Sequence, residues 1–345
     1  MPVSVVVGGQ FGSEGKGKVA LEFARATGAS AVVRVGGTNS GHTGIADNGT
    51  KWILRQIPAS ALWSNALIVL PPGSLIDPEI LEREVGALSI SPERLVIDAR
   101  ASVITADHKR DEEQGGLVGQ IGSTASGTGA ALRDRLARRA AHQLAGEHPY
   151  LKRFSVESTA SILRRMLQER KRVVVEGTQG FGLSLWHSSY FPYSTSRDTT
   201  ASAFLSESGL SPIDVDQVIL VIRTFPIRVG GNSGPLRDEI NWQIVADEAK
   251  LPKGFEERTS ATNRVRRVGR FDATLVRSAI EVNNPTHIVL NHLDYIEKNP
   301  GHLAKEFVES VELSIGRRVD YLGFDATKII RNPNEIDTVR LASAC

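Results

Sequence analysis

The sequence has very little cysteine, no long hydrophobic run and no excess of one charge. Its only cysteine is the last of 345 residues, Cys345, so an intrachain disulfide is excluded, which suits a reducing compartment. No apolar stretch approaches the roughly 18–20 residues that cross a bilayer. The 41 basic and 39 acidic residues leave a net charge of +2. The amino terminus lacks a signal-peptide pattern. We therefore expect a cytoplasmic globular protein whose partners include no nucleic acid and no membrane.

Short β-branched runs alternate with amphipathic segments along the whole chain. Apolar runs of this length between turn signals suit strands that are buried on both faces. The predicted strands are residues 3–7, 31–35, 66–70, 95–97, 173–175, 218–222 and 287–290. The predicted helices are residues 18–26, 78–85, 132–145, 158–168 and 271–282. This alternation predicts an α/β fold with a largely parallel central sheet and helices on both faces. No repeat or linker-like composition shift is evident, which favours one domain over residues 1–345.

The strongest local feature is the glycine-rich loop over residues 8–18, which follows the first predicted strand and precedes a helix. Glycines let a backbone approach a phosphate, and a helix amino terminus offers unpaired N–H groups to it. The loop is not a Walker A motif, because five residues separate Gly9 from Gly15 and because Gly17 replaces the required Ser or Thr. We interpret it as a phosphate-binding loop; the alternative is an ordinary turn between a strand and a helix.

Two more glycine-rich loops follow, over residues 36–44 and 122–129. The first places His42 at a predicted strand end, where open α/β sheets bind ligands; the alternative is a surface histidine. The second offers hydroxyl and amide groups to an anion, or is a flexible turn. Three arginines then share the predicted helix 132–145, either on a solvated face or against a phosphate. They are Arg135, Arg138 and Arg139.

In chain order, these loops and several later segments resemble the adenylosuccinate synthetase family. The family's GDEGKGK loop is similar to residues 12–18, its NAGHT loop to residues 39–43, and its EGAQG turn to residues 176–180. Further matches cover the third loop and the VARR, YPYVTSSNTT, TTGRPRR, KLD and STGPD motifs. They lie at residues 121–124, 136–139, 191–200, 261–267, 292–294 and 322–325. The resemblance runs nearly end to end and implies a fold related to the P-loop NTPases.

The resemblance implies a two-step ligation. A nucleoside triphosphate, with Mg²⁺ as cofactor, phosphorylates O6 of a 6-oxopurine nucleotide, and the amine of L-aspartate then displaces that phosphate. An oxo group leaves poorly until it is phosphorylated, and fixed donors spread the transferred charge. By resemblance, His42 is the general acid and Gln179 orients O6 or the base. The Mg²⁺ ligands would be the Gly41 carbonyl and, by its position, Ser13.

The resemblance also implies the binding residues of each substrate. The triphosphate would be held by Gly12, Ser13, Glu14, Gly15, Lys16, Gly17, Lys18, Gly41, His42, Thr43, Arg266, Asp294 and Gly323. The purine monophosphate would be held by Ser13, Lys16, Asn39, Ser123, Thr124, Arg138, Gln179, Thr195 and Arg264. The aspartate would be held by Ala261, Thr262, Asn263, Arg264 and Arg266. Arginine suits this last role because its planar fork pairs with a carboxylate. Arg138 would reach a neighbouring active site, which implies a homodimer.

Ser13 is the main departure from the family pattern, since it replaces an aspartate that ligates Mg²⁺ and takes a proton from N1 of the purine. Serine is a poor base and a weak metal ligand. We favour a change of substrate: guanine carries an amino group on C2, beside N1, and a serine leaves room for it and can accept its hydrogen bond. Phage relatives with serine here join aspartate to dGMP on the route to 2-aminoadenine DNA, and the short chain agrees with that branch. The cytoplasm would then be that of an infected bacterium.

His292 is a second departure, because it replaces the lysine of the KLD motif that helps to hold guanine in GTP. Asp294 of that motif is kept. The phage relatives use ATP or dATP, so we expect ATP as the donor here. Two alternatives stay open: an ordinary synthetase that uses IMP and GTP, and a non-catalytic nucleotide-binding relative.

Overall fold

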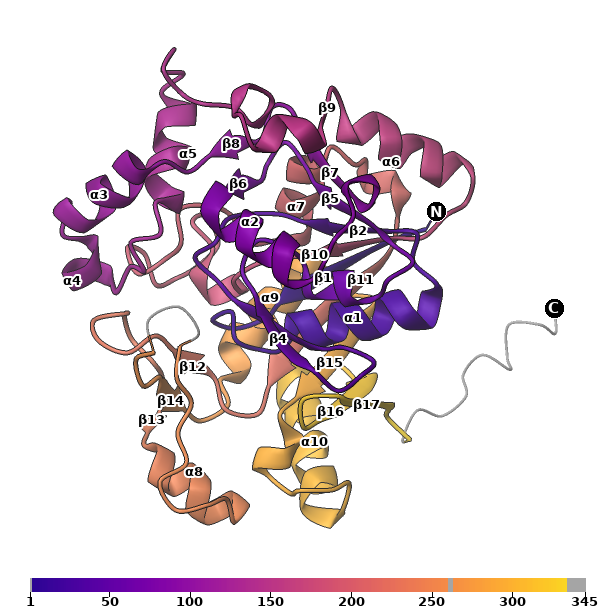
Figure 1. The fold of residues 1–345 in the computed structure, drawn as a ribbon. Helices are drawn as coiled ribbons and strands as arrows, with labels where there is room; N and C mark the ends of the chain where they lie inside the picture. The colour runs from indigo at the N-terminus through magenta and orange to yellow at the C-terminus, as the bar shows by residue number, and fades with distance from the viewer. Residues whose placement is uncertain (1, 260–262, 334–345) are drawn as a thin grey trace.

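The protein is described by a computed structural model over residues 2–259 and 263–333. Within these residues the centre is a ten-stranded sheet in the order β17-β16-β15-β11-β1-β10-β2-β5-β7-β9 (Figure 1). Neighbouring strands are parallel, except that β17 is antiparallel to β16. The strands are β1 Val3–Gly8, β2 Ala31–Arg34, β5 Leu67–Leu70, β7 Leu95–Asp98, β9 Ser155–Val156, β10 Val173–Glu176, β11 Val215–Arg223, β15 His287–Asn291, β16 Tyr321–Phe324 and β17 Lys328–Arg331. The predicted α/β class is confirmed.

Helices cover both faces of this sheet. They are α1 Lys16–Thr27, α2 Pro78–Ala87, α3 Ala106–Gln114, α4 Leu117–Ile121, α5 Thr128–Leu136, α6 Thr159–Gln168, α7 Ala201–Ser208, α8 Trp242–Ala249, α9 Ala273–Asn283 and α10 His302–Ile315. Short 3-10 helices are η1 Ala59–Leu62, η2 Pro92–Arg94, η3 Ala145–Glu147, η4 Leu151–Phe154, η5 Phe181–Leu183, η6 Pro212–Asp214 and η7 Leu293–Tyr295. No helix among the described residues is both long and apolar enough to cross a bilayer.

Three small sheets flank the main one. An antiparallel sheet combines β12 Ile227–Arg228, β14 Arg267–Gly269 and β13 Glu239–Ile240. The hairpin of β3 His42–Ile45 and β4 Lys51–Leu54 is antiparallel, whereas β6 Leu75–Ile76 and β8 Ser102–Val103 pair in parallel. The first of these sheets lies with α8 at the lower left of Figure 1, beside the amino-terminal loops.

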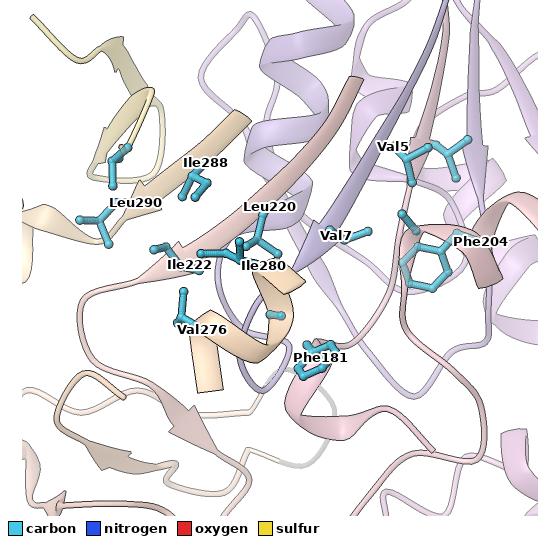
Figure 2. Close-up of a cluster of buried hydrophobic side chains, with 14 of the residues drawn as sticks. Val5, Val7, Phe181, Phe204, Leu220, Ile222, Val276, Ile280, Ile288 and Leu290 are labelled. Carbon is cyan, nitrogen blue, oxygen red and sulfur yellow. The ribbon is translucent and has the colours of Figure 1, made fainter. Parts of the chain in front are cut away.

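The alternation of side chains along the buried strands divides the core into two layers. Val5 and Val7 of β1 pack on the side covered by α6, α7, α9 and α10, whereas Val6 packs on the side covered by α1 and α2. Figure 2 shows the first layer, where Phe204 of α7 and Val276 of α9 meet the strand residues. Because both faces are covered, the central strands are mostly apolar, which is why the sequence shows them as β-branched runs.

The central strands bring the site loops together. In the sheet, β1 lies between β11 and β10, and β10 lies next to β2. The carboxyl ends of these parallel strands lie at one edge, so the loops after β1, β2 and β10 become neighbours although they are far apart in the chain. The sheet therefore assembles the glycine-rich loops at a single place.

The prediction of a helix over residues 132–145 is wrong in its second half. The helix α5 ends at Leu136, and Arg138 has a φ of 53° in the left-handed region. A non-glycine residue in this region ends a helix. Arg138 and Arg139 therefore lie beyond the helix that carries Arg135, so the three arginines are not on one helical face.

Candidate functional site

The loop between β1 and α1 is folded around a buried carboxylate. Gly15 takes a φ of 89° that favours glycine and starts α1. Oε1 of Glu14 accepts hydrogen bonds from the backbone N–H groups of Gln10 (3.0 Å) and Gly12 (2.7 Å). The Nζ of Lys16 lies 2.7 Å from Oε2 of Glu14 and 3.0 Å from the Gly12 carbonyl. The fully buried ion pair of Glu14 and Lys16 thus stabilises the conformation of this loop, which is of the type that binds phosphate.

His42 lies at the start of β3, buried beside two charged residues. Its Nδ1 is 2.7 Å from Oε1 of Glu176 and 2.6 Å from Nη1 of Arg34. Its Nε2 is buried and has no hydrogen-bond partner among the described residues. Burial, with Arg34 beside it, lowers the pKa of His42 to about 3. The imidazole is therefore neutral at physiological pH and offers Nε2 to a ligand.

The larger of two neighbouring cavities, which we call the donor pocket, has a volume of about 600 Å³. Its walls come from the first loop, the loop that carries His42, residues 251–258 together with Arg266, and the region after β15. It includes Gly12, Ser13, Gly15, Lys16, Gly17, Lys18, Gly41, His42, Thr43, Glu257, Arg266, His292, Asp294 and Tyr295. Its floor is thus a backbone of glycines with two lysines, which suits a polyphosphate.

The smaller cavity, which we call the monophosphate pocket, has a volume of about 160 Å³. It includes Phe11, Asn39, Glu112, Ser123, Thr124, Gln179, Tyr193, Thr195, Arg228 and Val229. The Nδ2 of Asn39 lies 3.5 Å from Oγ1 of Thr195, so residues far apart in the chain meet here. Hydroxyl and amide groups and one buried arginine suit a phosphate ester.

A single layer of backbone separates the two pockets. Gly12 lines the donor pocket and Gln179 lines the monophosphate pocket. A Cβ on Gly12 would lie 3.1 Å from Cα of Gln179, so only glycine allows this approach. Groups bound in the two pockets would meet across this wall.

The structure brings most of the predicted site residues into one of the two pockets. Ser13 and Lys16 line the donor pocket rather than the monophosphate pocket, and Glu14 lies beneath the loop. Gly323 lies on β16, against Asn291 and Lys18, outside both pocket linings. Glu14 therefore supports the loop from inside, while the direct contacts belong to its neighbours.

Besides Glu14 and Gly323, three further predicted residues lie outside both pocket linings. Arg138, Asn263 and Arg264 are exposed. The backbone of Arg264 pairs with Thr259, whose carbonyl also accepts the N–H of Asn263. Ala261 and Thr262 lie outside the described residues. Of the residues predicted to bind aspartate, Arg266 is the one that the described part of the chain places in the lining of the donor pocket.

Several buried charged residues of the site escaped the sequence prediction. Arg34 and Glu176 contact His42, and Glu112 lies under the third loop. Arg223 donates to the Ser13 carbonyl (2.8 Å) and pairs with Glu257. Arg34, Glu176 and Arg223 are each the last residue of a buried strand, and this position was the available signal.

Charges around the donor pocket are strongly perturbed by burial and pairing. Desolvation lowers the pKa of Lys18 to about 8, while its Nζ donates to the carbonyls of Phe324 (3.1 Å) and Asp325 (2.9 Å). Although burial opposes it, Arg223 and its neighbours lower the pKa of Glu257 to about 2. Burial raises the pKa of Asp294. The pocket therefore combines a titratable ammonium group with fixed charges.

The Mg²⁺ implied by the resemblance can be tested against the oxygen donors of the donor pocket. Gly41 and Ser13 both line it, and both are neutral donors. The Ser13 carbonyl already accepts a hydrogen bond from Arg223, which leaves its hydroxyl group. Mg²⁺ takes oxygen ligands and shares them between protein and phosphate groups. The donor set fits such an ion, with the negative charge coming mainly from a bound triphosphate.

Comparisons with known proteins find the same family along almost the whole chain. A family model described as adenylosuccinate synthetase matches residues 5–149 and 142–301. The adenylosuccinate synthetase of Thermococcus sibiricus is 38% identical over 331 residues, which are 92% of this chain and 94% of the relative. That of Methanocaldococcus jannaschii is 36% identical over 351 residues, 98% of this chain and 96% of the relative. Ordinary synthetases of this short length therefore exist, so length does not separate the branches.

Two solved structures are also similar. Succinoaminodeoxyadenylate synthetase of cyanophage S-2L, bound to dGMP and to dATP as an energy donor, is 31% identical with a TM-score of 0.81. The similarity covers 96% of this chain and 95% of that one. The fully ligated adenylosuccinate synthetase of Plasmodium falciparum is 20% identical with a TM-score of 0.81, over 96% and 99% of the two chains. The last likeness concerns the fold alone.

Proposed function

This chain belongs to the adenylosuccinate synthetase family of carbon–nitrogen ligases, and on that premise we propose that it joins L-aspartate to C6 of dGMP with ATP. The products are 2-amino-2′-deoxy-N6-succinyladenylate, ADP and phosphate, which supply 2-aminoadenine for phage DNA. The observation that carries the choice of dGMP is Ser13. It stands where the family has an aspartate, directly after Gly12, whose backbone packs on Gln179.

The cyanophage neighbour supports dGMP and an adenine nucleotide, because its structure holds dGMP and dATP. The small side chain of Ser13 leaves room for the C2 amino group of guanine and can accept its hydrogen bond. His292, in place of a lysine, is half-buried and neutral, since desolvation and the nearby Arg223 lower its pKa well below the usual value. That neutral ring removes a cation from the base-binding end of the donor pocket and fits adenine.

In the first step, O6 of dGMP attacks the terminal phosphorus of ATP where the two pockets adjoin, the bond from that phosphorus to the bridging oxygen breaks, and ADP leaves. The Nε2–H of neutral His42 donates to the transferring group, and Gln179 orients the purine from the other side. Lys16 and the loop amides hold the phosphates. Mg²⁺, when bound at the Gly41 carbonyl and the Ser13 hydroxyl, would spread the charge of the transferred group.

In the second step, the amine of aspartate attacks C6, the bond from C6 to the phosphorylated oxygen breaks, and phosphate leaves. Arg266 lines the donor pocket, half-buried, and pairs with an aspartate carboxylate. Arg138 of a second copy holds the 5′-phosphate, because this arginine is exposed and lies outside both pockets of its own chain. The functional unit is then a homodimer.

The direct test is turnover of the purified protein with aspartate, ATP and Mg²⁺, with dGMP or IMP offered in parallel. Phosphate release and the succinyl product are followed. We expect product from dGMP and little or none from IMP. Turnover of IMP alone would contradict the proposal, and binding of dGMP and ATP without aspartate-dependent turnover would indicate a non-catalytic relative.

One observation favours a second candidate, the ordinary reaction of IMP with GTP. The two relatives named adenylosuccinate synthetase that are described above are 38% and 36% identical to the chain, against 31% for the cyanophage enzyme. Overall sequence identity indicates common descent. Ser13, in contrast, concerns one proposed contact with the purine, so we give it more weight in the choice of substrate. The parallel assay separates the two candidates, with GTP offered in place of ATP as a further arm.

A further inference from the structure

Three atoms converge on the buried side of His42. Nη1 of Arg34 lies 2.6 Å from Nδ1 of His42 and 2.9 Å from Oε1 of Glu176, and Nδ1 lies 2.7 Å from the same oxygen. All three side chains are almost fully buried, so the contacts among them limit where the imidazole proton can lie. Which atom carries the proton decides what Nε2 can do in the donor pocket.

The pairing of strands fixes this arrangement. Arg34 ends β2 and Glu176 ends β10, and the two residues lie opposite each other in the parallel register of these strands. Arg34 also donates to the carbonyls of Ser40 (3.2 Å) and Arg55 (3.3 Å). It therefore anchors the loop that presents Gly41 and His42 as well as the imidazole itself.

The carboxylate of Glu176 is satisfied without a proton from His42. Its Oε2 accepts the N–H (2.9 Å) and the hydroxyl (2.8 Å) of Ser60. Its Oε1 accepts the N–H of Ala59 (3.0 Å) and the N–H of Arg34. These four donors fill the in-plane acceptor sites of a carboxylate.

Arginine, in contrast, can only donate. Its guanidinium group has no acceptor and stays protonated in proteins. Nδ1 of His42 lies 2.6 Å from Nη1 and 2.7 Å from Oε1 of Glu176, and the filled acceptor sites of the carboxylate favour the arrangement in which Nδ1 presents its lone pair to Arg34. The single proton of the neutral ring is then on Nε2, the nitrogen that faces no protein partner.

We propose that Arg34 is a positioning residue that holds His42 in the tautomer protonated on Nε2, ready to donate to the transferring phosphoryl group. Glu176 holds Arg34 in place and does not take the His42 proton. The role of Nε2–H in phosphoryl transfer rests on the proposed function, whereas the tautomer does not depend on which purine is used.

Nitrogen NMR on ¹⁵N-histidine-labelled protein tests the tautomer directly. The chain has eight histidines, and the spectrum of His42→Asn identifies the His42 signals by their loss. We expect a protonated Nε2 and an unprotonated Nδ1 in the wild-type protein. A protonated Nδ1 would overturn the proposal, whatever the substrate.

Kinetics with the monophosphate that is turned over test the consequence. Arg34→Met removes every donor, and we expect kcat to fall on the order of 10²–10³-fold with little change in either nucleotide KM. Arg34→Lys keeps a group that can only donate, and it should restore kcat to within about tenfold of the wild type. Full kcat in a folded Arg34→Met protein, or equal losses in both variants, would contradict the proposal.

Arg164→Met is the matched control. Arg164 pairs with the buried carboxylate of Asp214 at 2.8 and 2.6 Å, outside both pocket linings. Its loss should lower the melting temperature but leave kcat unchanged. A failure of dGMP turnover would overturn the substrate assignment alone, because the NMR result stands without it.

Discussion

At the scale of single residues, the proposed choice of purine depends on Ser13 in the first loop. The first loop is held by Glu14 and Lys16, so a change at position 13 alters the pocket without unfolding the loop. Within the described residues, the Ser13 side chain makes no hydrogen bond that stabilises the fold. Its backbone carbonyl accepts a hydrogen bond from Arg223. Substitution here therefore tests recognition rather than stability.

We expect Ser13→Asp to exchange the substrate preference. The carboxylate fills the space beside N1 and C2, so kcat/KM for dGMP should fall about 10–100-fold, the range for one misfitting small group in a pocket. Turnover of IMP should rise. Steady-state kinetics with both nucleotides measure this, and Ser13→Ala serves as the control for loss of the hydroxyl. An unchanged preference in Ser13→Asp would remove Ser13 from substrate selection.

Lys18 gives the donor pocket a pH dependence. Its pKa is lowered to about 8, and the ammonium form, which is present below that pH, is the one that attracts phosphates. We therefore expect kcat/KM for ATP to decline as the pH rises through about 8, since this parameter reports the free enzyme. In Lys18→Arg the side chain keeps its positive charge at higher pH, so the decline of kcat/KM for ATP should move to higher pH. If kcat/KM for ATP still declined at about pH 8 in Lys18→Arg, the titrating group would not be Lys18.

The sequence indicated the residues that line the two pockets more readily than those that support them. Glycines, His42 and Gln179 stand out in loops, where a fixed pattern of small and polar residues points to binding. Arg34 and Glu176 lie 142 positions apart, and they meet only because β2 and β10 pair in register. No local pattern contains that pairing.

At the scale of elements, the third loop is held by a carboxylate from another helix. Glu112 of α3 accepts the N–H groups of Gly127 (2.8 Å), Gly129 (2.7 Å) and Ala130 (3.1 Å) at the amino terminus of α5. The negative charge also suits the positive end of the helix. The loop is therefore shaped before a monophosphate arrives.

Glu112→Gln should weaken the binding of the purine monophosphate. An amide accepts fewer hydrogen bonds from these N–H groups than a carboxylate does, and a charged hydrogen bond contributes about 1.5–3 kcal/mol. We expect the KM of the monophosphate to rise about tenfold while the KM of ATP stays constant. Glu113→Gln, at an exposed neighbouring position, is the control. A parallel rise in both KM values would indicate a general loss of structure.

The strands were predictable and some helices were not, for a physical reason. A strand buried on both faces carries a nearly continuous apolar run, as Val5–Val7 of β1 and Val173–Val175 of β10 do, so its signal survives in a short window. The predicted end of α5 was wrong because the apolar pattern continues past Leu136, whereas Arg138 adopts a left-handed φ of 53°. The helices α8 and α10 carried no site motif and were not predicted.

At the scale of the whole molecule, the proposed homodimer makes each active site depend on two chains. Mixing His42→Asn with Arg138→Ala should restore activity that neither variant has alone. In a mixed dimer, one site has an intact His42 and receives an intact Arg138 from its partner. Random exchange should yield about a quarter of the wild-type activity, as expected for a two-fold assembly. Mixed dimers without activity would place Arg138 outside the site.

The thin wall between the donor pocket and the monophosphate pocket has a consequence for ligand design. Gly12 on one side and Gln179 on the other are in near contact, so two fragments bound in the two pockets would need only a short bridge. A bridged compound binds its second fragment at an effective concentration in the millimolar range, and its avidity exceeds that of either fragment. A guanine nucleotide joined through a phosphate chain to adenosine would thus act as a two-headed inhibitor, and Gly12 would set the length of its bridge.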